Sequence, residues 1–402
     1  FVADGGKYAE AKIVFKRNGK EVFIANANRF SIGSDRISSK EAAVKIFFDN
    51  DSIYHGNLQF KYIDSKRQLQ LYRNANGLSG APMLNTYHNI TMDFELLQWN
   101  IDGDFIKIGS LPGSSESKVS FESIARYDSA RYMMLGGIDA VHPLFLVDNY
   151  VKEKQEEEIY VEEFARFANF PLHQIQPLLI RLARYGFIFY DYGEDRIKVL
   201  PKLYNYIDAA SEIGDYDVIV FNSVISPGEY KTSDKYMVNA VLNLATKDLN
   251  ILGIHNVELS KKRQVHLYPK DGLLVVKKNR SFIFNGEIYA GQGRLNLFGK
   301  NFVFHYDEFK LDLNEIDSVS LSVPVEPIIK DADGRIRLTK LKTVFEYMQN
   351  NSQISQGELI IDDPTNKSGV RKDSFPEFPI FRSFKDSYAY YDKSSIYNGV
   401  YD

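Results

Sequence analysis

Four acidic residues in the second half of the chain are the side chains best suited to catalysis. Glycoside hydrolases use two carboxyl groups that face each other across a cleft. The candidates for such a pair are Glu287, Asp307, Asp312 and Glu315. Outward positions of β-strands also commonly carry charge, and that interpretation is the favoured one. A carbohydrate-binding or carbohydrate-processing β protein is therefore kept as the first alternative function.

Two further acidic segments have the composition of cation-binding loops. Asp331 and Asp333 begin a calcium-type loop, but a third ligand and the closing Glu are missing. Because Asp and Gly accept left-handed backbone geometry, we interpret this segment as a hairpin turn. Asp362, Asp363 and Asn366 stand in a second polar loop, typical of a solvated connection. We predict no metal ion and no cofactor, and we leave cation binding at either acidic pair open.

Other reactive groups are absent or scattered. The 402 residues contain no cysteine, which excludes disulfides, thiolate zinc sites, iron–sulfur clusters and cysteine nucleophiles. The histidines show no metal-ligand spacing and are interpreted as isolated surface or strand residues: His55, His88, His142, His173, His255, His266 and His305. No phosphate-binding glycine loop, dinucleotide-binding fingerprint or zinc-protease helix occurs. The sequence therefore predicts a protein that is not an enzyme.

The composition favours β-strands and an exported protein. The 28 Phe and 26 Tyr residues belong to types that prefer strands. A net charge of −4 argues against bulk attraction to nucleic acid or to an anionic membrane. No apolar run approaches the length that crosses a bilayer. The lack of cysteine suits export, and the first and last residues suggest that the chain is a piece of a longer protein.

Alternating apolar and polar residues predict two strand-rich regions. Residues 8–75 alternate with a period of two, residues 75–92 are loop-like, and strands resume near 94–99 and 105–108. Eight short strands are expected in the second region, separated by glycines or polar pairs: 255–259, 265–267, 273–276, 282–288, 295–297, 302–306, 311–316 and 319–323. Their regular spacing is typical of a jelly roll or a short solenoid. A short amphipathic helix is expected at 341–348.

A helical module is expected between these two regions. Apolar spacing predicts three helices near 144–151, 161–167 and 175–183, with Gly186 ending the third. Two strands joined by the turn 191–195 follow, and Pro201 is placed to begin a last helix. Three helices and a two-stranded wing resemble the winged-helix family, over about residues 141–207.

The resemblance implies that the third helix would enter the major groove of DNA. Its available polar side chains are His173, Gln174, Gln176, Arg181 and Arg184. Residues 148–202 carry ten acidic and eight basic side chains, a net charge of −2, whereas DNA binding relies on cations that neutralise phosphates. The wing turn holds three carboxylates, and a proline interrupts the third helix. We therefore favour a structural or protein-contact role, with DNA binding as the second alternative.

The expected architecture is a multidomain α+β chain of mainly β class. The β parts would be antiparallel sandwich, jelly-roll-like or short solenoid units around the small helical insert. Four segments are predicted: an antiparallel β domain at 1–127, the winged-helix-like module at 128–212, a regular β domain at 213–325, and a mixed β segment at 326–402 that continues past the end.

Several segments taken together resemble very long, β-rich proteins of the bacterial cell envelope that have no known activity. They are residues 51–55, 121–123, 302–316, 357–369 and 390–393. The resemblance implies a non-enzymatic structural or protein-interaction segment in the cell envelope, in the periplasm or at the outer membrane. Its partners would be other protein subunits of an envelope assembly and not nucleic acid, and no transmembrane segment is expected in this chain.

Overall fold

The architecture is taken from a computed structural model, in which most of the chain is described. The described residues are 1–5, 10–74, 77–136, 141–191, 194–228, 237–325, 328–331, 335–340, 355–371, 375–384, 388–391, 394–398 and 400–401. The helix expected at 341–348 lies outside them. Within the described residues the protein is mainly β and antiparallel with a small helical part, which confirms the predicted fold class.

The chain divides into two compact units. Unit 1 comprises Phe1–Gly214 and Ser223–Leu249, and unit 2 comprises Asp215–Asn222 and Asn250–Asp402. The segments predicted at 1–127 and 128–212 thus lie in one unit, and the segment predicted at 213–325 is shared between both. Two strands, β16 (Val220–Ile225) and β18 (Leu249–Ile251), each contain a boundary between the units.

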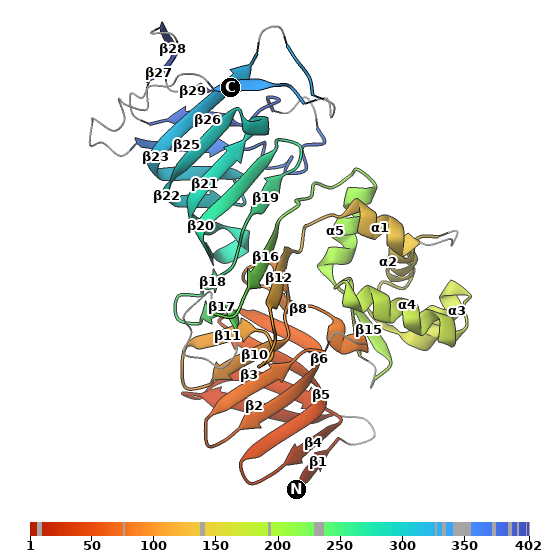
Figure 1. Ribbon diagram of the computed structural model, residues 1–402. Coiled ribbons are helices and arrows are strands. Elements are labelled where there is room, and N and C mark those ends of the chain that lie inside the picture. Colours follow the sequence, from red (N-terminus) through yellow and green to blue (C-terminus); the bar gives the residue numbers. More distant parts are fainter. Residues whose placement is uncertain are drawn as a thin grey trace. The chain divides into compact units, whose positions relative to one another are not determined.

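The strands of unit 1 pair in antiparallel fashion (Figure 1). They are β1 (Val2–Asp4), β2 (Ala11–Arg17), β3 (Lys20–Ala27), β4 (Arg29–Ile32), β5 (Arg36–Phe48), β6 (Asp51–Ile63), β7 (Gln68–Tyr72), β8 (Met83–Asn85), β9 (Ile90–Asp93), β10 (Leu96–Asn100), β11 (Phe105–Gly109), β12 (Ser117–Ser123) and β17 (Val238–Asn243). Asn18 and Gly19 both have positive φ, as the predicted hairpin turn requires. The rings of Phe23, Phe60 and Trp99 lie together in the core.

Part of the region expected to be a loop is ordered. Residues 75–92 include the short 3₁₀ helix η1 (Gly77–Gly80), the strand β8 and most of the strand β9. Met83, Ile90 and Met92 are fully buried in these strands. The strands are only three and four residues long, too short for a periodic pattern to reveal them.

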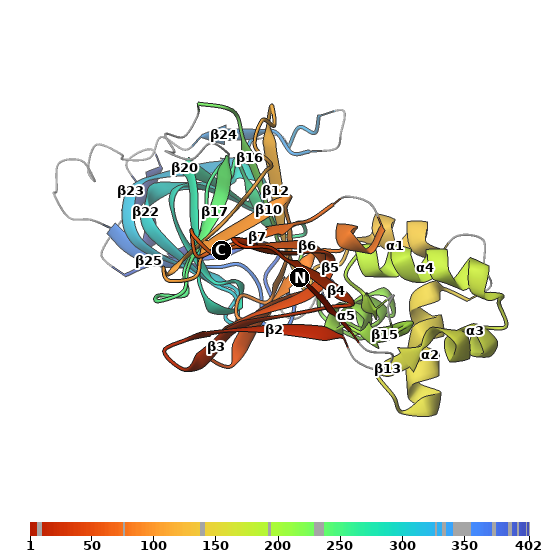
Figure 2. The same ribbon diagram turned by 90° about the horizontal axis from the view of Figure 1, so that it is seen from below.

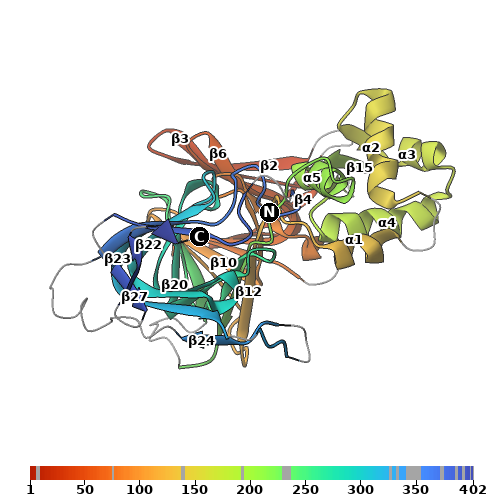
Figure 3. The same cartoon turned by 90° about the horizontal axis from the view of Figure 1, so that it is seen from above.

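The helical module follows β12 and belongs to unit 1. Its elements are α1 (Ser129–Gly136), α2 (Pro143–Lys154), β13 (Glu158–Tyr160), α3 (Val161–Ala168), α4 (Leu172–Arg184), β14 (Ile188–Asp191), β15 (Arg196–Val199) and α5 (Pro201–Ala210). Figures 2 and 3 show that the helices gather to one side of the unit 1 strands. The predictions for α2, α3, α4 and α5 are confirmed. Gly186 follows α4 with a φ of +76°.

Three features of the module differ from the sequence prediction. The helix α1 and the strand β13 were not expected; β13 pairs with β15 and gives a three-stranded sheet in the order β13-β15-β14. The helix α4 continues through Pro177 and does not stop there. A proline removes one backbone hydrogen bond, and the buried apolar side chains of α4 still hold the helix in place.

Unit 2 is an antiparallel meander. Its remaining elements are β19 (Val257–Ser260), β20 (Val265–Val276), η2 (Lys278–Arg280), β21 (Phe282–Ala290), η3 (Gly291–Gly293), β22 (Leu295–His305), β23 (Lys310–Pro324), β24 (Leu338–Lys340), β25 (Ser355–Ile360), β26 (Ile380–Ser383), β27 (Tyr388–Tyr391), β28 (Ser394–Asn398) and β29 (Val400–Tyr401). The strands from β19 to β23 pair in sequence order, followed by β25, β26 and β29.

Six of the eight short strands expected in unit 2 are halves of longer ones. The strands β20, β22 and β23 each join two of the predicted runs. Gly286 of β21 pairs with Gly299 of β22 where the register shifts. A Cβ at Gly299 would lie 2.0 Å from the carbonyl oxygen of Glu315. These glycines therefore permit close backbone approach at irregularities inside strands, and they do not mark the strand ends.

Helices of the described chain are short. The longest, α4, has 13 residues. No helix among the described residues has the length and apolar character needed to cross a membrane.

Candidate functional site

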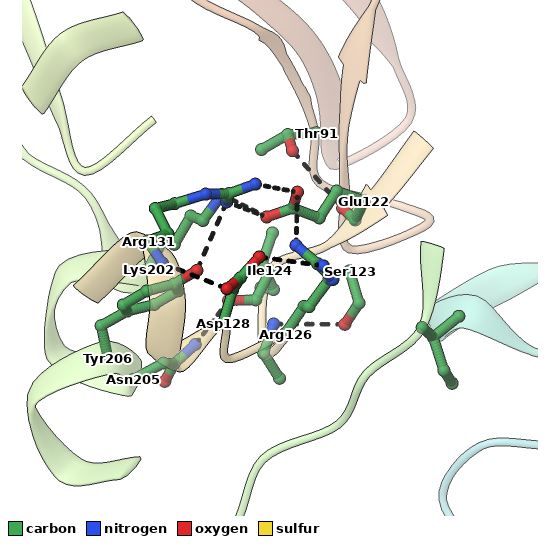
Figure 4. Close-up of polar contacts among 12 residues, drawn as sticks. Thr91, Glu122, Ser123, Ile124, Arg126, Asp128, Arg131, Lys202, Asn205 and Tyr206 are labelled. Carbon is green, nitrogen blue, oxygen red and sulfur yellow. Dashed lines mark hydrogen bonds and ion pairs between the residues drawn. The ribbon is translucent and has the colours of Figure 1, made fainter. Parts of the chain in front are cut away.

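A buried cluster of charged residues lies where the helical module meets the strands of unit 1. We call it the Glu122 cluster: Glu122 on β12, Arg126 and Asp128 in the following connection, Arg131 on α1 and Lys202 on α5. Figure 4 shows that Arg131 and Lys202 converge on the carboxylate of Glu122. The cluster thus joins one strand to two helices.

Glu122 is the centre of the cluster. Arg131 donates Nη1 to Oε1 of Glu122 at 2.7 Å and Nη2 to Oε2 at 3.0 Å, the bidentate geometry preferred by guanidinium and carboxylate. Lys202 Nζ lies 2.6 Å from the same Oε1. Arg126 Nη1 donates to Oε2 at 3.2 Å. Both carboxylate oxygens of Glu122 therefore face two cationic nitrogens each.

Asp128 completes the cluster. Its Oδ2 accepts a hydrogen bond from Arg126 Nη2 at 3.2 Å, and its Oδ1 accepts one from the backbone N–H of Arg131 at 3.1 Å. Three cationic side chains thus meet two carboxylates in the cluster, an excess of one positive charge.

Burial and this charge excess shift the pKa values in the cluster. Burial would raise the pKa of Glu122, but Lys202, Arg131 and Arg126 outweigh it and lower the pKa to about 2. The side chain of Lys202 is 4% exposed, and burial lowers its pKa. Glu122 opposes this change, whereas the neighbouring Arg131 and Arg126 add to it. The Glu122 carboxylate is therefore held ionised, and the three cations share it.

Local sequence explains the orientation of Lys202 and Glu122. On α5, Lys202 precedes Leu203 and lies one helical turn before Tyr206, so it stands on the buried stripe of the helix. Its ammonium group lies 5.9 Å from the centre of the Tyr206 ring. On β12, Glu122 alternates with the buried Phe121, so its side chain points to the opposite face of the strand. That face meets the helical module.

The Glu122 cluster forms one wall of a cavity of about 430 Å³, which we call the basic pocket. The charged residues that line it are Asp93, Glu122, Arg131, Arg181, Arg184 and Lys202. The pocket therefore contains four cationic side chains and two carboxylates.

The polar side chains expected to reach DNA do not all point away from the protein. His173 and Gln174 are exposed, and Gln176 is half-buried. Arg181 and Arg184, the two cations of α4, line the basic pocket beside β9 and β12. Arg181 Nη2 also donates to the carbonyl oxygen of Leu135 on α1 at 3.2 Å. Both arginines of α4 therefore border this pocket, and both remain exposed to solvent.

The four candidate carboxylates for glycoside hydrolysis lie in unit 2. Three of them accept hydrogen bonds from different local partners: Asp307 from Asn279, Asp312 from His305, and Glu315 from Asn301. Glu287 lies on β21 opposite Phe298. These contacts are typical of charged positions along strands and turns.

The carboxylates of the two candidate cation loops accept hydrogen bonds from groups of the protein itself. Asp331 accepts a hydrogen bond from the backbone N–H of Arg335 at 2.9 Å in a hairpin, as predicted, whereas Asp333 lies outside the described residues. Asp362 accepts one from Arg263 Nε at 2.5 Å, and Asp363 accepts one from the backbone of Thr365. Where the chain is described, no group of three or more His, Asp or Glu is arranged to hold a metal ion.

Three of the histidines make hydrogen bonds that hold local structure together. His55 is buried; its Nε2 donates to the carbonyl oxygen of Ala81 at 2.8 Å and its Nδ1 accepts from Asn57 N at 2.9 Å. Burial lowers the pKa of His55 to about 4. His142 caps α2 through Nδ1, and His88 lies fully buried between Asn85 and the carbonyl oxygen of Lys247.

Sequence reasoning did not select the residues of the Glu122 cluster. One signal was present, because Lys202 shares the apolar stripe of α5, where a lysine needs an acidic partner. The identity of that partner depends on the tertiary fold. Comparisons of the chain with protein-family models, with curated proteins and with solved structures gave no significant match.

Proposed function

We propose that this chain is a non-enzymatic structural or protein-interaction segment of a large bacterial cell-envelope protein, exported to the periplasm or associated with the outer membrane. The observation that carries the proposal is the Glu122 cluster, through which the helical module is held on the strands of unit 1. Buried charges paired in this way hold elements at a fixed orientation and serve no reaction in themselves.

We further propose that the module is winged-helix-like but serves protein contacts. The order α2, β13, α3, α4, β14, β15 and the three-stranded sheet support the resemblance. Only two cations, Arg181 and Arg184, stand on α4, and both line a pocket against β9 and β12, which argues against groove binding by this helix, because binding to DNA relies on many phosphate contacts. Fold by itself does not assign a function.

The wing is also in contact with the protein itself. Phe189 of β14 packs on Tyr54 of β6, with ring centres 5.3 Å apart. A Cβ at Gly56 would lie 1.3 Å from the Phe189 ring, so the two strands approach without space for a larger residue. A wing packed in this way supports an architectural role for the module.

The test of the envelope proposal uses the native full-length protein. Cells are fractionated, the protein is extracted gently, and its native mass is measured by size-exclusion chromatography with light scattering. We expect it in the envelope fraction with a mass above that of one chain. A monomer in the soluble cytoplasmic fraction would contradict the proposal.

The DNA alternative has its own test. A mobility-shift titration of the full chain at low salt, where phosphate contacts are strongest, is expected to show no saturable shift. A saturable shift that Arg181→Gln and Arg184→Gln abolish would replace the protein-contact role with DNA binding.

A further inference from the structure

The basic pocket of unit 1 contains more positive charge than its own carboxylates balance. Glu122 is already shared by Arg126, Arg131 and Lys202. Asp93 is paired with Arg73, whose side chain is 8% exposed. No carboxylate among the described residues forms an ion pair with either arginine of α4 that lines the pocket.

The geometry points to a binding site for a small ligand that carries a phosphate group, with Arg181 and Arg184 as its principal contacts. Guanidinium groups are planar, weakly hydrated and able to donate two parallel hydrogen bonds to one oxyanion. Lys202 and Arg131 also line the pocket and add positive charge to it. This inference does not rest on the proposed envelope function.

The positive charges are close enough to affect one another. Burial lowers the pKa of Arg73 to about 10, and Arg184 contributes to that shift. Two neighbouring guanidinium groups repel each other, and an anion placed between them and the pocket wall would relieve that repulsion. The pocket is therefore better suited to an anion than to a neutral or cationic ligand.

The cationic wall is held in position before any ligand arrives. Arg131 is fixed by two hydrogen bonds to Glu122, and Lys202 by one. Arg181 is anchored at Leu135. Preorganised donors lose little conformational entropy on binding, so a small ligand can bind with useful affinity.

The size of the pocket favours a phosphorylated small molecule over free phosphate as the ligand. A cavity of about 430 Å³ is at the small end of ligand pockets and exceeds the volume of a phosphate ion. Neutral donors on Thr91, Ser120 and Tyr185 also line it. A phosphorylated small molecule such as a sugar phosphate would use this remaining space, whereas free phosphate would leave it to water.

Isothermal titration calorimetry of the full chain at low ionic strength provides the test. The probes are inorganic phosphate and glucose 1-phosphate, and the variant combines Arg181→Gln with Arg184→Gln. We expect saturable binding of one equivalent to the wild type and a loss of at least tenfold in affinity in the variant. Tighter binding of glucose 1-phosphate would assign the sugar phosphate, and equal affinities would assign the free ion.

A matched control distinguishes a site from general charge attraction. Arg166 is an exposed arginine on α3 of the same module, and Arg166→Gln is expected to change the affinity less than twofold. Trp99 fluorescence checks that each variant is folded. Absence of saturable binding to the wild type, or equal losses in the control and the double variant, would overturn the proposal.

Discussion

Each unit of the molecule contains a carboxylate buried against arginine, and the surroundings of Glu122 in unit 1 and of Asp362 in unit 2 differ. In unit 1, Glu122 is 13% exposed, faces three cations and lines a cavity. In unit 2, Asp362 is fully buried and pairs with one arginine, Arg263, which is itself 5% exposed. One site has a charge excess and open space, and the other is balanced and closed.

The closed site explains what a purely structural ion pair requires. Asp362 accepts hydrogen bonds from Arg263 Nε, from Asn366 Nδ2 and from the backbone of Asp363. Arg263 Nη1 donates in turn to the carbonyl oxygen of Glu377. Every such contact is internal to unit 2, so the pair links its loops. A structural ion pair needs only one cation for each carboxylate, so the excess of cations at Glu122 is not explained by a structural role.

The largest effect is expected at Glu122. Glu122→Gln leaves Arg126, Arg131 and Lys202 buried together without their shared carboxylate, and we expect a loss of about 4–5 kcal/mol in the free energy of unfolding of unit 1. Urea titration followed by Trp99 fluorescence measures it, because Trp99 is the single tryptophan of the chain and lies in unit 1. A loss below 1 kcal/mol would contradict a structural role for the cluster.

A smaller loss, confined to unit 2, is expected at Asp362. Asp362→Asn leaves the buried Arg263 with one neutral partner in place of a charge, which costs about 3 kcal/mol. Urea titration followed by circular dichroism should show the lower transition while the Trp99 transition stays unchanged. The control is Asp363→Asn, at the half-buried neighbour in the same loop, which forms no ion pair with Arg263. Equal shifts in both variants would mean that the Arg263–Asp362 pair has no special importance.

The pH dependence of the free energy of unfolding distinguishes the contribution of His55 from that of the ion pairs. The unfolded chain binds a proton on His55 below pH 6.5, but the folded protein binds it only below about pH 4. The free energy of unfolding of unit 1 should therefore fall as the pH drops through this window, by at most about 3 kcal/mol. Urea titrations at several pH values, followed by Trp99 fluorescence, measure the slope.

Two variants test the assignment of that slope. His55→Gln should remove most of it and leave a smaller part from His142, whose pKa burial also lowers, whereas His173→Gln, at an exposed histidine, should retain it. Glu122 acts in a lower window, because its stabilising charge is lost only as the pH falls from about 4.5 to about 2. A slope that persists undiminished in His55→Gln would assign the titration to another group.

The smallest stability effect is expected where the wing meets β6. Gly56→Ala forces the ring of Phe189 to move, at a cost of about 2 kcal/mol in unit 1. Gly33→Ala is a suitable control, because a Cβ there meets its nearest atom at an ordinary 3.5 Å. Trp99-monitored unfolding compares the two, and Phe189→Leu should restore part of the stability lost in Gly56→Ala. Equal effects at Gly33 and Gly56 would argue against tight packing of the wing.

The local parts of this fold could be predicted from sequence, and the contacts over long distances could not. The apolar spacing on α4, Pro201 at the start of α5, Gly186 after α4 and the turn at Asn18 are local signals, and each was confirmed. Gly299 was misleading, because a glycine at a strand irregularity and a glycine at a strand end have the same local pattern.

The candidate site shows the same limit. Glu122 and Lys202 are 80 residues apart, and nothing in either local sequence names the other as its partner. The lysine on the apolar stripe of α5 indicates that an acidic partner exists, but only the docking of the module on β12 identifies it. Single-sequence patterns therefore predict the elements better than the site.

A double-mutant cycle on Glu122 and Lys202 tests most directly whether the cluster holds the helical module on the strands. The variants are Glu122→Gln, Lys202→Met and the combination, each measured by urea titration at Trp99. We predict that the combination is more stable than the sum of the single losses implies, with a coupling of about 2 kcal/mol or more. Additive losses, within about 0.5 kcal/mol, would contradict the account.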